Sequence, residues 1–320
     1  MRRSVLPALR PETPRRLVLA ASTGGHLAQL VRLAPGLGAS DDSLWITFRT
    51  PQSESLLAGR DVLHVPYIRP RDLRSVCTAF AAIRPRLAGQ GFAAAVSTGA
   101  ALALAALPAA RSAGVPTLYV ESVSRMEGPS VSGRVIAGLR LGEIRTQHPS
   151  WARGRWGLHP SVLSTYRSAA RATPCPGAPR LFVTLGTIRG YGFPALVDRI
   201  VDLGLAGPDT VWQLGDTRVS RDLPGTVHRE MSAEQFERAA LDADCVVTHA
   251  GVGTVLGLLE HGISPVVVPR RRHRGEHVDD HQRQLVALLR QAGVGCPVEL
   301  EELRRDTVVQ AVTSEVSLAA

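Results

Sequence analysis

Short apolar runs alternate with helix-length amphipathic segments along the whole chain. Nearly continuous hydrophobic strands separated by helices are typical of a parallel sheet that is covered on both faces. Each run has the length of a buried strand and is followed by Gly, Pro or Ser. The pattern therefore predicts an α/β fold in which a doubly wound parallel sheet occurs twice. The runs span residues 16–22, 43–48, 61–67, 93–98 and 116–122 in the first half, and 180–187, 210–216, 225–230, 243–250 and 264–269 in the second.

The clearest boundary signal is the segment ARATPCPGAPR, residues 170–180, which is rich in Pro. Pro and Gly interrupt helices and strands, so such a segment is typical of a linker. With 320 residues, the chain is also long for a single core. We therefore expect two Rossmann-like domains, residues 1–175 and 176–320, joined by a linker at about 169–180. Ligands of such sheets bind at the carboxyl ends of the strands, so the two sheets are expected to face each other across a cleft.

The net charge of +9 is unevenly distributed, with a balance of +13 over residues 1–175 and −4 over residues 176–320. A basic half indicates an anionic partner, either a lipid surface or nucleic acid. The chain has only 4 Tyr and no interleaving of aromatic and basic residues, which argues against a groove for single-stranded nucleic acid. We therefore expect no nucleic-acid partner. The first domain is expected to bind an anionic membrane surface, with Arg69, Arg71 and Arg74 near strand-end loops.

The remaining signals concern the compartment. The 4 Cys form no C-x-x-C pair, which suits a reducing environment. The basic N-terminus lacks the apolar core of a secretory signal. Residues 92–110 carry no charge, but they are mostly Ala, and a strand, a turn and a buried helix explain them better than a transmembrane span. These signals predict a cytoplasmic protein that is peripheral on the inner face of the cell membrane.

Two glycine-containing segments follow apolar strands and lead into predicted helices. ASTGGHLAQL, residues 20–29, places Gly24 and Gly25 before His26, and AGVGT, residues 250–254, repeats the arrangement. Glycine lets backbone N–H groups approach a ligand, and the positive end of the following helix favours a phosphate. The first segment matches neither the Rossmann nor the Walker pattern, so a tight turn with a packed His remains the alternative there. For the second segment the alternative is an ordinary turn between a strand and a helix.

A polar cluster, RHRGEHVDDHQ at residues 272–282, follows the last predicted strand. Its short polar side chains can hydrogen-bond the hydroxyl groups of a sugar. His273, His277 and His281 are four residues apart, so a zinc site is the alternative. An Arg-rich flank opposes a cation, and no further pair of ligands occurs elsewhere in the chain. We therefore expect no metal.

Together, these motifs resemble the glycosyltransferases of family 28, which have the GT-B fold of two Rossmann-like domains. ASTGGH, VSTGAALALAAL and YVESVSR resemble the acceptor subunit of the dolichol-linked N-acetylglucosaminyltransferase, and LFVTLGT and THAGVGTVLGLLEHG resemble its donor subunit. Here both lie in one chain, as in bacterial transferases that build exopolysaccharide on polyprenyl diphosphate. The resemblance implies inverting, metal-independent transfer from a UDP-sugar co-substrate (UDP-GlcNAc or another UDP-hexose or uronate), with no cofactor. The implied acceptor is lipid-linked or a related small molecule.

The resemblance also implies roles for individual residues. His26 is the expected catalytic base, which takes the proton of the acceptor hydroxyl. The residues expected to bind the donor diphosphate are Thr184, Gly186, Thr187, His249, Gly251, Gly253 and Thr254. Those expected to contact the donor sugar or nucleotide are Gln213, Met231, Glu260, Glu276, Asp280, His281 and Gln282. Those expected on the acceptor side are Gly24, Gly25, Glu121 and Arg125.

The chain departs from the family at one position of the donor helix. The family usually has a Glu there that binds the ribose, and this chain has Gly257. Glu260, one turn further on, is the candidate replacement. Three alternatives remain open: a natural-product glycosyltransferase, a UDP-sugar epimerase of similar fold, and a non-catalytic partner of another transferase.

Overall fold

The computed structural model of the chain describes residues 12–69, 72–171, 179–187, 190–277 and 280–318, without the side chain of His281. The chain divides into two compact units, residues 1–162 and 163–320. Each unit contains its own parallel sheet, as the sequence predicts. The boundary expected after residue 175 falls within residues 172–178, outside the described part.

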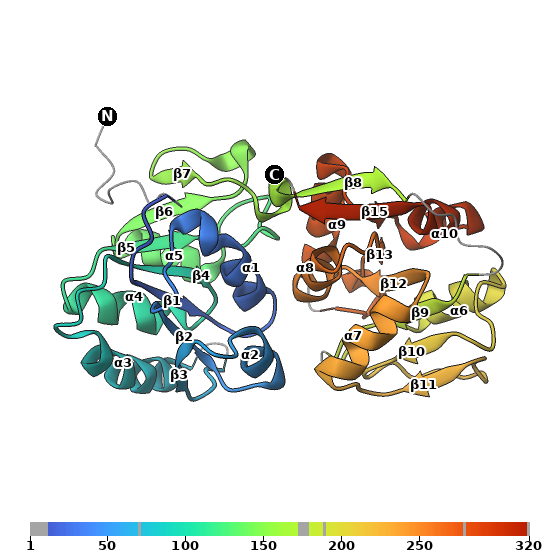
Figure 1. Cartoon of the computed structure of the whole chain (residues 1–320), viewed down its shortest axis with the longest axis horizontal. Helices are drawn as coiled ribbons and strands as arrows, with labels where there is room; N and C mark the ends of the chain where they lie inside the picture. The colour runs from blue at the N-terminus through green and yellow to red at the C-terminus, as the bar shows by residue number, and fades with distance from the viewer. Residues whose placement is uncertain (1–11, 70–71, 172–178, 188–189, 278–279, 319–320) are drawn as a thin grey trace. The chain divides into compact units, whose positions relative to one another are not determined.

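The first unit is built on a sheet of seven parallel strands in the order β3-β2-β1-β4-β5-β6-β7 (Figure 1). The order of the strands reverses between β1 and β4, so the loops that follow these two strands lie next to each other at the carboxyl edge. Every residue of β1, β2 and β4 is buried, because both faces of the sheet are covered. The strands are β1 (Leu17–Ala21), β2 (Leu44–Phe48), β3 (Asp61–Val65), β4 (Ala94–Gly99), β5 (Thr117–Val120), β6 (Glu143–Thr146) and β7 (Trp156–Leu158).

Local polar signals start several helices of the first unit. Thr50 accepts a hydrogen bond from the backbone N–H of Ser53 before α2, and Asp72 accepts one from Ser75 before α3. The helices are α1 (Gly25–Leu33), α2 (Pro51–Leu56), α3 (Leu73–Leu87), α4 (Ala103–Ser112) and α5 (Val131–Gly138), with 3₁₀ turns η1 (Pro35–Leu37), η2 (Pro149–Trp151) and η3 (Val162–Thr165).

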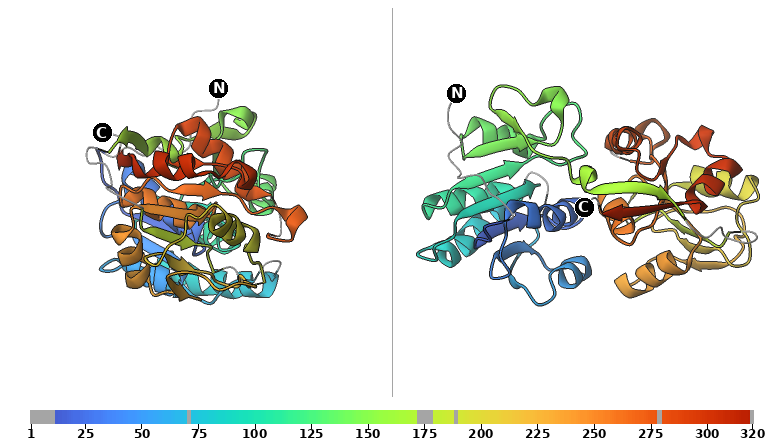
Figure 2. Two further views of the ribbon diagram at one scale, coloured as in Figure 1. Left: turned by 90° about the vertical axis from the view of Figure 1, so that its right-hand side faces the viewer. Right: turned by 45° about the horizontal axis from the view of Figure 1, so that its top comes forward.

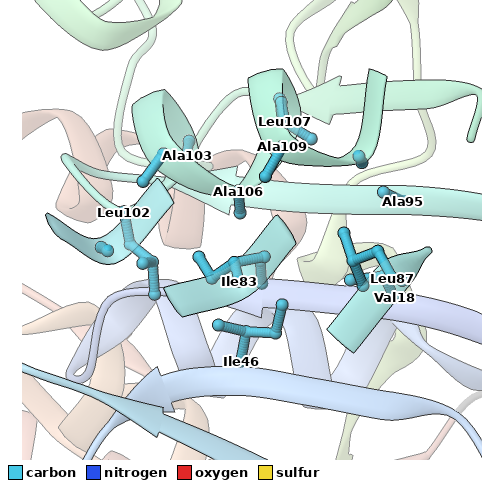
Figure 3. Close-up of a cluster of buried hydrophobic side chains, with 14 of the residues drawn as sticks. Val18, Ile46, Ile83, Leu87, Ala95, Leu102, Ala103, Ala106, Leu107 and Ala109 are labelled. Carbon is cyan, nitrogen blue, oxygen red and sulfur yellow. The ribbon is translucent and has the colours of Figure 1, made fainter. Parts of the chain in front are cut away.

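The largest core cluster of the first unit packs α3 and α4 against the sheet. Figure 3 shows Ile83 of α3 between Ile46 of β2 and the alanines of α4. Small Ala side chains let α4 approach α3 closely. This explains the uncharged segment 92–110, which forms β4 and most of a buried ten-residue helix rather than a membrane span. Among the residues that the structure describes, no helix is long and apolar enough to cross a membrane.

The second unit repeats the strand order of the first. Its six parallel strands run β11-β10-β9-β12-β13-β14, so the order reverses between β9 and β12. The loops after these two strands are therefore neighbours at the carboxyl edge. The strands are β9 (Leu181–Thr184), β10 (Val211–Gln213), β11 (Thr226–His228), β12 (Cys245–His249), β13 (Val266–Val268) and β14 (Cys296–Pro297).

Capping residues also mark helix ends in the second unit. Ser232 and Gln235 form a reciprocal capping box at the start of α7. Gly293, with φ of 65°, ends α9 in the left-handed conformation. The helices are α6 (Pro194–Asp202), α7 (Ala233–Asp242), α8 (Val252–Glu260), α9 (His281–Ala292) and α10 (Arg305–Val312), with 3₁₀ turns η4 (Arg272–Arg274) and η5 (Leu300–Glu302).

A small antiparallel sheet completes the second unit. β8 (Tyr166–Ala170) pairs along its whole length with β15 (Ser314–Leu318), as the right-hand view of Figure 2 shows. The residues of β8 precede the expected linker in sequence, yet they belong to the second unit because their strand partner comes from the end of the chain.

Candidate active site

The loops of the first unit that carry the predicted residues meet at the carboxyl edge of its sheet. The backbone N–H of Ser22, after β1, donates to the carbonyl of Gly99 at 3.0 Å, and the N–H of Ala100 donates to Ser22 Oγ at 3.3 Å. The loop after β1 is thereby joined to the loop after β4. Gly24, Gly25 and His26 lie in the first of these loops and the first turn of α1.

His26 is fixed by two hydrogen bonds to Thr98. Its Nδ1 lies 2.6 Å from the carbonyl oxygen of Thr98, and Thr98 Oγ1 donates to the carbonyl of His26 at 2.7 Å. A carbonyl can only accept, so Nδ1 carries the proton and Nε2 of the neutral ring has the lone pair. The side chain is partly exposed. The arrangement therefore presents a His whose outer nitrogen can accept a proton.

The surroundings keep His26 neutral. Burial lowers its pKa below 6.5, and the hydrogen bond to the Thr98 carbonyl and the carboxylate of Glu121 only partly oppose that effect. The positive charge of Arg125 lowers the pKa further. Glu121 and Arg125, which the sequence assigns to the acceptor side, therefore both act electrostatically on His26.

Glu121 is fully buried and its carboxylate is saturated with hydrogen bonds. Oε1 accepts from Tyr119 Oη and from the backbone N–H of Ser122, both at 3.1 Å. Oε2 accepts from the N–H of Ser130 at 2.8 Å and from its hydroxyl at 3.0 Å. Because Ser130 caps α5, Glu121 holds the loop between β5 and α5 in place. In this arrangement it acts on an acceptor only through that loop or through His26.

Gly24 and Gly25 differ in whether their backbone N–H groups are free to bind a ligand. Gly24 has φ of 87°, and its N–H and C=O are both occupied by the side chain of Gln52, at 2.6 and 3.2 Å. Gly25 begins α1, so its N–H belongs to the first turn, which has no partner inside the helix. Of the two, the Gly25 N–H is the one that can face an anion.

Sequence reasoning did not assign Gly99, which shapes the site. Its φ is 110°, and a Cβ there would lie 2.9 Å from His26 Cε1 and 3.0 Å from Nδ1. Only glycine leaves room for the His26 ring. Gln29 was also missed; it is buried and joins α1 to the β5 loop through Ser122 Oγ at 3.1 Å and the N–H of Val123 at 2.8 Å. Gly99 carries the same signal as the other assigned glycines, because it directly follows a predicted strand, whereas Gln29 has no distinctive signal.

In the second unit, His249 lies between the loop after β9, which contains Gly186, and the loop after β12, which contains Gly251. Its ring lies against Gly186, where a Cβ would approach His249 Cε1 to 2.5 Å, and against Gly251, where a Cβ would also collide with the ring. Gly186 has φ of 73°, which favours glycine in its own right. The structure thus brings together three residues that the sequence assigns to the diphosphate. Burial and then the charge of Arg270 lower the pKa of His249 to about 3, so the ring stays neutral.

The start of α8 lies directly after this packed histidine. Gly251 is the N-cap, and Gly253 and Thr254 lie in the first turn. First-turn N–H groups lack partners inside the helix and sit at its positive end, which suits a phosphate. Thr187, on the neighbouring loop, is exposed. The geometry is therefore that of an anion-binding edge.

Thr184 and Gln213 are the last residues of β9 and β10. Thr184 Oγ1 donates to Gln213 Oε1 at 2.6 Å, and both side chains are buried. Met231 follows β11 and lines a cavity of about 510 Å³ with His228 and Gln235. Contacts of these residues with a nucleotide stay predictions.

The polar cluster after β13 folds back on its own backbone. Glu276 Oε2 accepts from the N–H of Arg271 at 2.9 Å, and burial raises the pKa of this carboxyl. Asp280 Oδ1 accepts from the N–H of Arg272 at 3.1 Å. Gln282 Oε1 accepts from the N–H of Arg270 at 2.9 Å. These side chains build the loop, and their contacts with a sugar stay predictions, as does the role of His281.

Glu260 lies apart from the other predicted donor residues. It is the last residue of α8, about 12 Å from the start of that helix, and its carboxylate accepts a hydrogen bond from Tyr166 Oη at 3.4 Å. Gly257 lies in the helix interior, and a Cβ there would meet nothing within 4 Å. Glu260 therefore does not occupy the space beside Gly257.

Of the three histidines spaced by four residues, the structure describes the side chains of His273 and His277 but not that of His281. His277 packs beside the ring of Tyr191, with 5.9 Å between the centroids. Within the described part of the chain, no group of three His, Cys, Asp or Glu side chains could hold a metal ion.

Comparisons with known proteins identify the second unit. Residues 232–318 match the glycosyltransferase family 28 C-terminal domain. The chain is 26% identical, over 294 residues, to the UDP-N-acetylglucosamine--N-acetylmuramyl-(pentapeptide) pyrophosphoryl-undecaprenol N-acetylglucosamine transferase of Prochlorococcus marinus strain MIT 9303. That alignment covers 86% of this chain and 81% of the relative.

Solved structures share the fold over nearly the full length. Acinetobacter baumannii MurG has a TM-score of 0.54 and 18% identity, covering 93% of this chain and 89% of its own. The UDP-GlcNAc 2-epimerase of Neisseria meningitidis, bound to UDP-GlcNAc, has a TM-score of 0.52 and 9% identity, covering 89% and 96%. At these identities the likeness concerns the fold, which does not by itself decide the reaction. Together with the domain match and the curated relative, it supports a GT-B glycosyltransferase that is similar to those of family 28.

Proposed function

We propose that the protein transfers a sugar from a UDP-sugar to a polyprenyl-diphosphate-linked acceptor in cell-surface polysaccharide synthesis, with inversion and without a metal. The name of the Prochlorococcus relative supports this proposal, since it specifies a UDP-sugar and a pyrophosphoryl-undecaprenol acceptor. The donor sugar is UDP-GlcNAc or another UDP-hexose or uronate.

The observation that carries the proposal is the state of His26. The acceptor hydroxyl must lose a proton as it attacks the anomeric carbon. Nε2 of a neutral ring, oriented by the Thr98 carbonyl, is suited to take that proton. Burial lowers the pKa of His26, so the ring is in the accepting form at neutral pH. Attack on the side opposite the leaving group inverts the anomeric carbon.

The departing diphosphate gains negative charge during this step. The first-turn N–H groups of α8 and its positive end supply stabilisation there, which is the support for a reaction without a metal. The same edge carries Gly186, Gly251 and Thr254, so we assign donor binding to the second unit. Transfer then needs both units, because the base belongs to the first.

Release of UDP, measured with and without a lipid-linked acceptor, tests the function. A transferase releases UDP from its donor only when the acceptor is present, apart from slow hydrolysis. An epimerase releases UDP or interconverts sugars with no acceptor, and a non-catalytic partner does neither. His26→Gln serves as the internal control, since Gln hydrogen-bonds but takes no proton at neutral pH. Near-normal turnover of that variant would contradict the role of His26.

We further propose that the first unit binds an anionic membrane surface. Val131 and Val135 of α5 and Leu139, its C-cap, are spaced by four residues and are 76%, 39% and 64% exposed, so they form one apolar stripe. Arg134 and Arg140, on the same segment, are exposed. Such a helix lies in the membrane interface with its apolar face inserted.

Vesicle binding tests this surface. Replacing Val135 and Leu139 by Ser should weaken binding to anionic vesicles, and added salt should weaken the remaining electrostatic part. Val309→Ser in the second unit is the matched control, because Val309 is also exposed, at 60%. Arg69 and Arg74 are exposed as well, whereas Arg71 lies outside the described residues. Equal binding to neutral and anionic vesicles would remove the electrostatic argument.

A further inference from the structure

Arg270 is a fully buried residue that links separate parts of the donor edge. It follows β13, and its guanidinium reaches the loop after β9. Nη2 donates to the carbonyl of Leu185 at 2.5 Å, and Nη1 donates to the carbonyl of Tyr191 at 3.2 Å. Its backbone N–H donates to Gln282 at the start of α9. One side chain therefore joins the residues on either side of Gly186 and Thr187 to the loop after β13.

The charge of Arg270 is poorly compensated. Its Nε is buried without a hydrogen-bond partner, and among the described residues no carboxylate forms an ion pair with it. Burial lowers its pKa to about 10, with Glu276 opposing, so the group remains a cation at neutral pH. A buried cation without an ion pair loses its hydration, and only its hydrogen bonds offset that loss. A hydrophobic residue would fill this space at lower cost, which indicates that the two carbonyl contacts have a use.

The residues around Arg270 indicate that its contacts with the Leu185 and Tyr191 carbonyls fix the position of the loop after β9. The loop after β9 lies so close to the His249 ring that Gly186 has no room for a Cβ. His249 in turn packs on Gly251, the N-cap of α8. Arg270 thus holds Leu185 and Tyr191, on either side of Gly186 and Thr187, to the segment after β13. We propose that Arg270 is a positioning residue that holds the loop after β9 in the geometry that binds the donor diphosphate.

This inference rests on the proposed function, because it concerns the same donor edge. The alternative is that Arg270 only stabilises the fold. The two differ in kinetics: a variant that is partly unfolded has fewer active molecules and a lower apparent kcat, but its molecules keep the Kd for UDP and the KM for the donor. A displaced diphosphate loop raises the donor KM and the UDP Kd and leaves the acceptor KM unchanged.

The chain offers a matched control in Arg199. This residue of α6 is part-buried, and its Nε and Nη2 donate to the carbonyl of Leu303 at 3.2 and 2.8 Å. Arg199→Met thus removes an arginine–carbonyl contact of the same kind elsewhere in the second unit. Arg270→Met removes both charge and contacts, whereas Arg270→Lys keeps the charge but replaces the two-armed donor by a single ammonium.

The experiment uses the full chain. UDP binding is measured by calorimetry, KM and kcat are measured for the donor and the acceptor, and unfolding is followed without nucleotide. We expect both Arg270 variants to raise the UDP Kd and the donor KM about ten- to a hundredfold, the effect of misplacing binding groups by about 1 Å. Arg199→Met should leave both constants within twofold. If Arg270→Met does not fold, Arg270→Lys carries the test.

Two results would overturn the inference. UDP binding by Arg270→Lys at the wild-type Kd would show that charge alone matters, and equal Kd values for Arg270→Met and Arg199→Met would show a role in the fold only. Failure of the proposed function looks different. In that case the wild-type protein itself shows no acceptor-dependent release of UDP, whatever residue 270 is.

Discussion

Replacing Gly99 by Ala tests whether the position of the His26 ring matters for turnover. The added Cβ would lie 2.9 Å from His26 Cε1, and ordinary contacts begin at 3.4 Å, so the ring must retreat by about half an ångström. That movement acts against the hydrogen bond of 2.6 Å between His26 Nδ1 and the Thr98 carbonyl. The substitution therefore displaces the proposed base without removing it.

Gly99→Ala should have two separate effects, a loss of stability and a loss of turnover. Because φ of Gly99 is 110°, an Ala there is strained and lowers the free energy of unfolding by about 1–3 kcal/mol. Removing a general base altogether lowers the rate about 10²–10⁴-fold. A base displaced by part of an ångström retains some function, so we expect turnover to fall about ten- to a hundredfold. The UDP Kd should not change, because Gly99 belongs to the first unit.

The control separates strain from displacement. Gly114 has φ of 77° in the same unit, and a Cβ there would meet nothing within 4 Å, so Gly114→Ala is strained without moving His26. UDP release in the presence of a lipid-linked acceptor is compared for both variants, with urea unfolding to confirm that each is folded. Equal turnover of the two variants would refute the reasoning, because the strain alone would then explain the loss.

Three further predictions concern pH and stability. Because partial burial lowers the pKa of His26, the acid limb of kcat/KM should have its midpoint below pH 6.5, and a midpoint above that value would contradict a base whose pKa is lowered. His249 has a pKa of about 3 when folded and 6.5 when unfolded, so the unfolded state binds the extra proton between these values. Stability should therefore be complete above pH 6.5 and fall by up to about 1.4 kcal/mol per pH unit below it, with a smaller slope in His249→Gln as measured by urea unfolding. Gly257→Ala should raise the free energy of unfolding by about 0.5–1 kcal/mol, since the helix has open space there; unchanged stability would argue against that geometry.

The fold was largely predictable because its strands are buried on both faces. All ten predicted runs contain an observed strand, from β1 to β5 and from β9 to β13. The strands that were missed are short or partly exposed: in β8, only Tyr166 is buried, and β15 is exposed at Glu315, Ser317 and Leu318. A strand that buries few residues has no continuous apolar run. The pairing of β8 with β15 also joins distant segments, which no local pattern reports.

Site residues could be predicted where a loop contains a glycine directly after a strand. They could not be predicted where they depend on contacts between residues that are far apart in the sequence. Gly186 and Gly251 stood out as glycines after strands, and the structure packs both on His249. Arg270 did not stand out, because it is one of four Arg within five residues and only the fold shows which of them is buried. Glu260 was proposed from its spacing alone. Its carboxylate accepts a hydrogen bond from Tyr166, a residue that lies 94 positions away, and its contact with a nucleotide stays a prediction.

The same local pattern, a buried strand followed by a glycine-containing loop with a His, leads to two different kinds of histidine. Both rings are neutral because burial lowers their pKa values. His249 is 8% exposed and fills the space between Gly186 and Gly251, so it keeps two backbone loops apart. His26 is partly exposed, and among the described residues its ring has one hydrogen bond, from Nδ1 to a carbonyl, which leaves Nε2 as an acceptor. Proton transfer requires such an accessible nitrogen, so we assign the proposed base to the first unit, although the glycines around His249 give the second unit the stronger sequence motif.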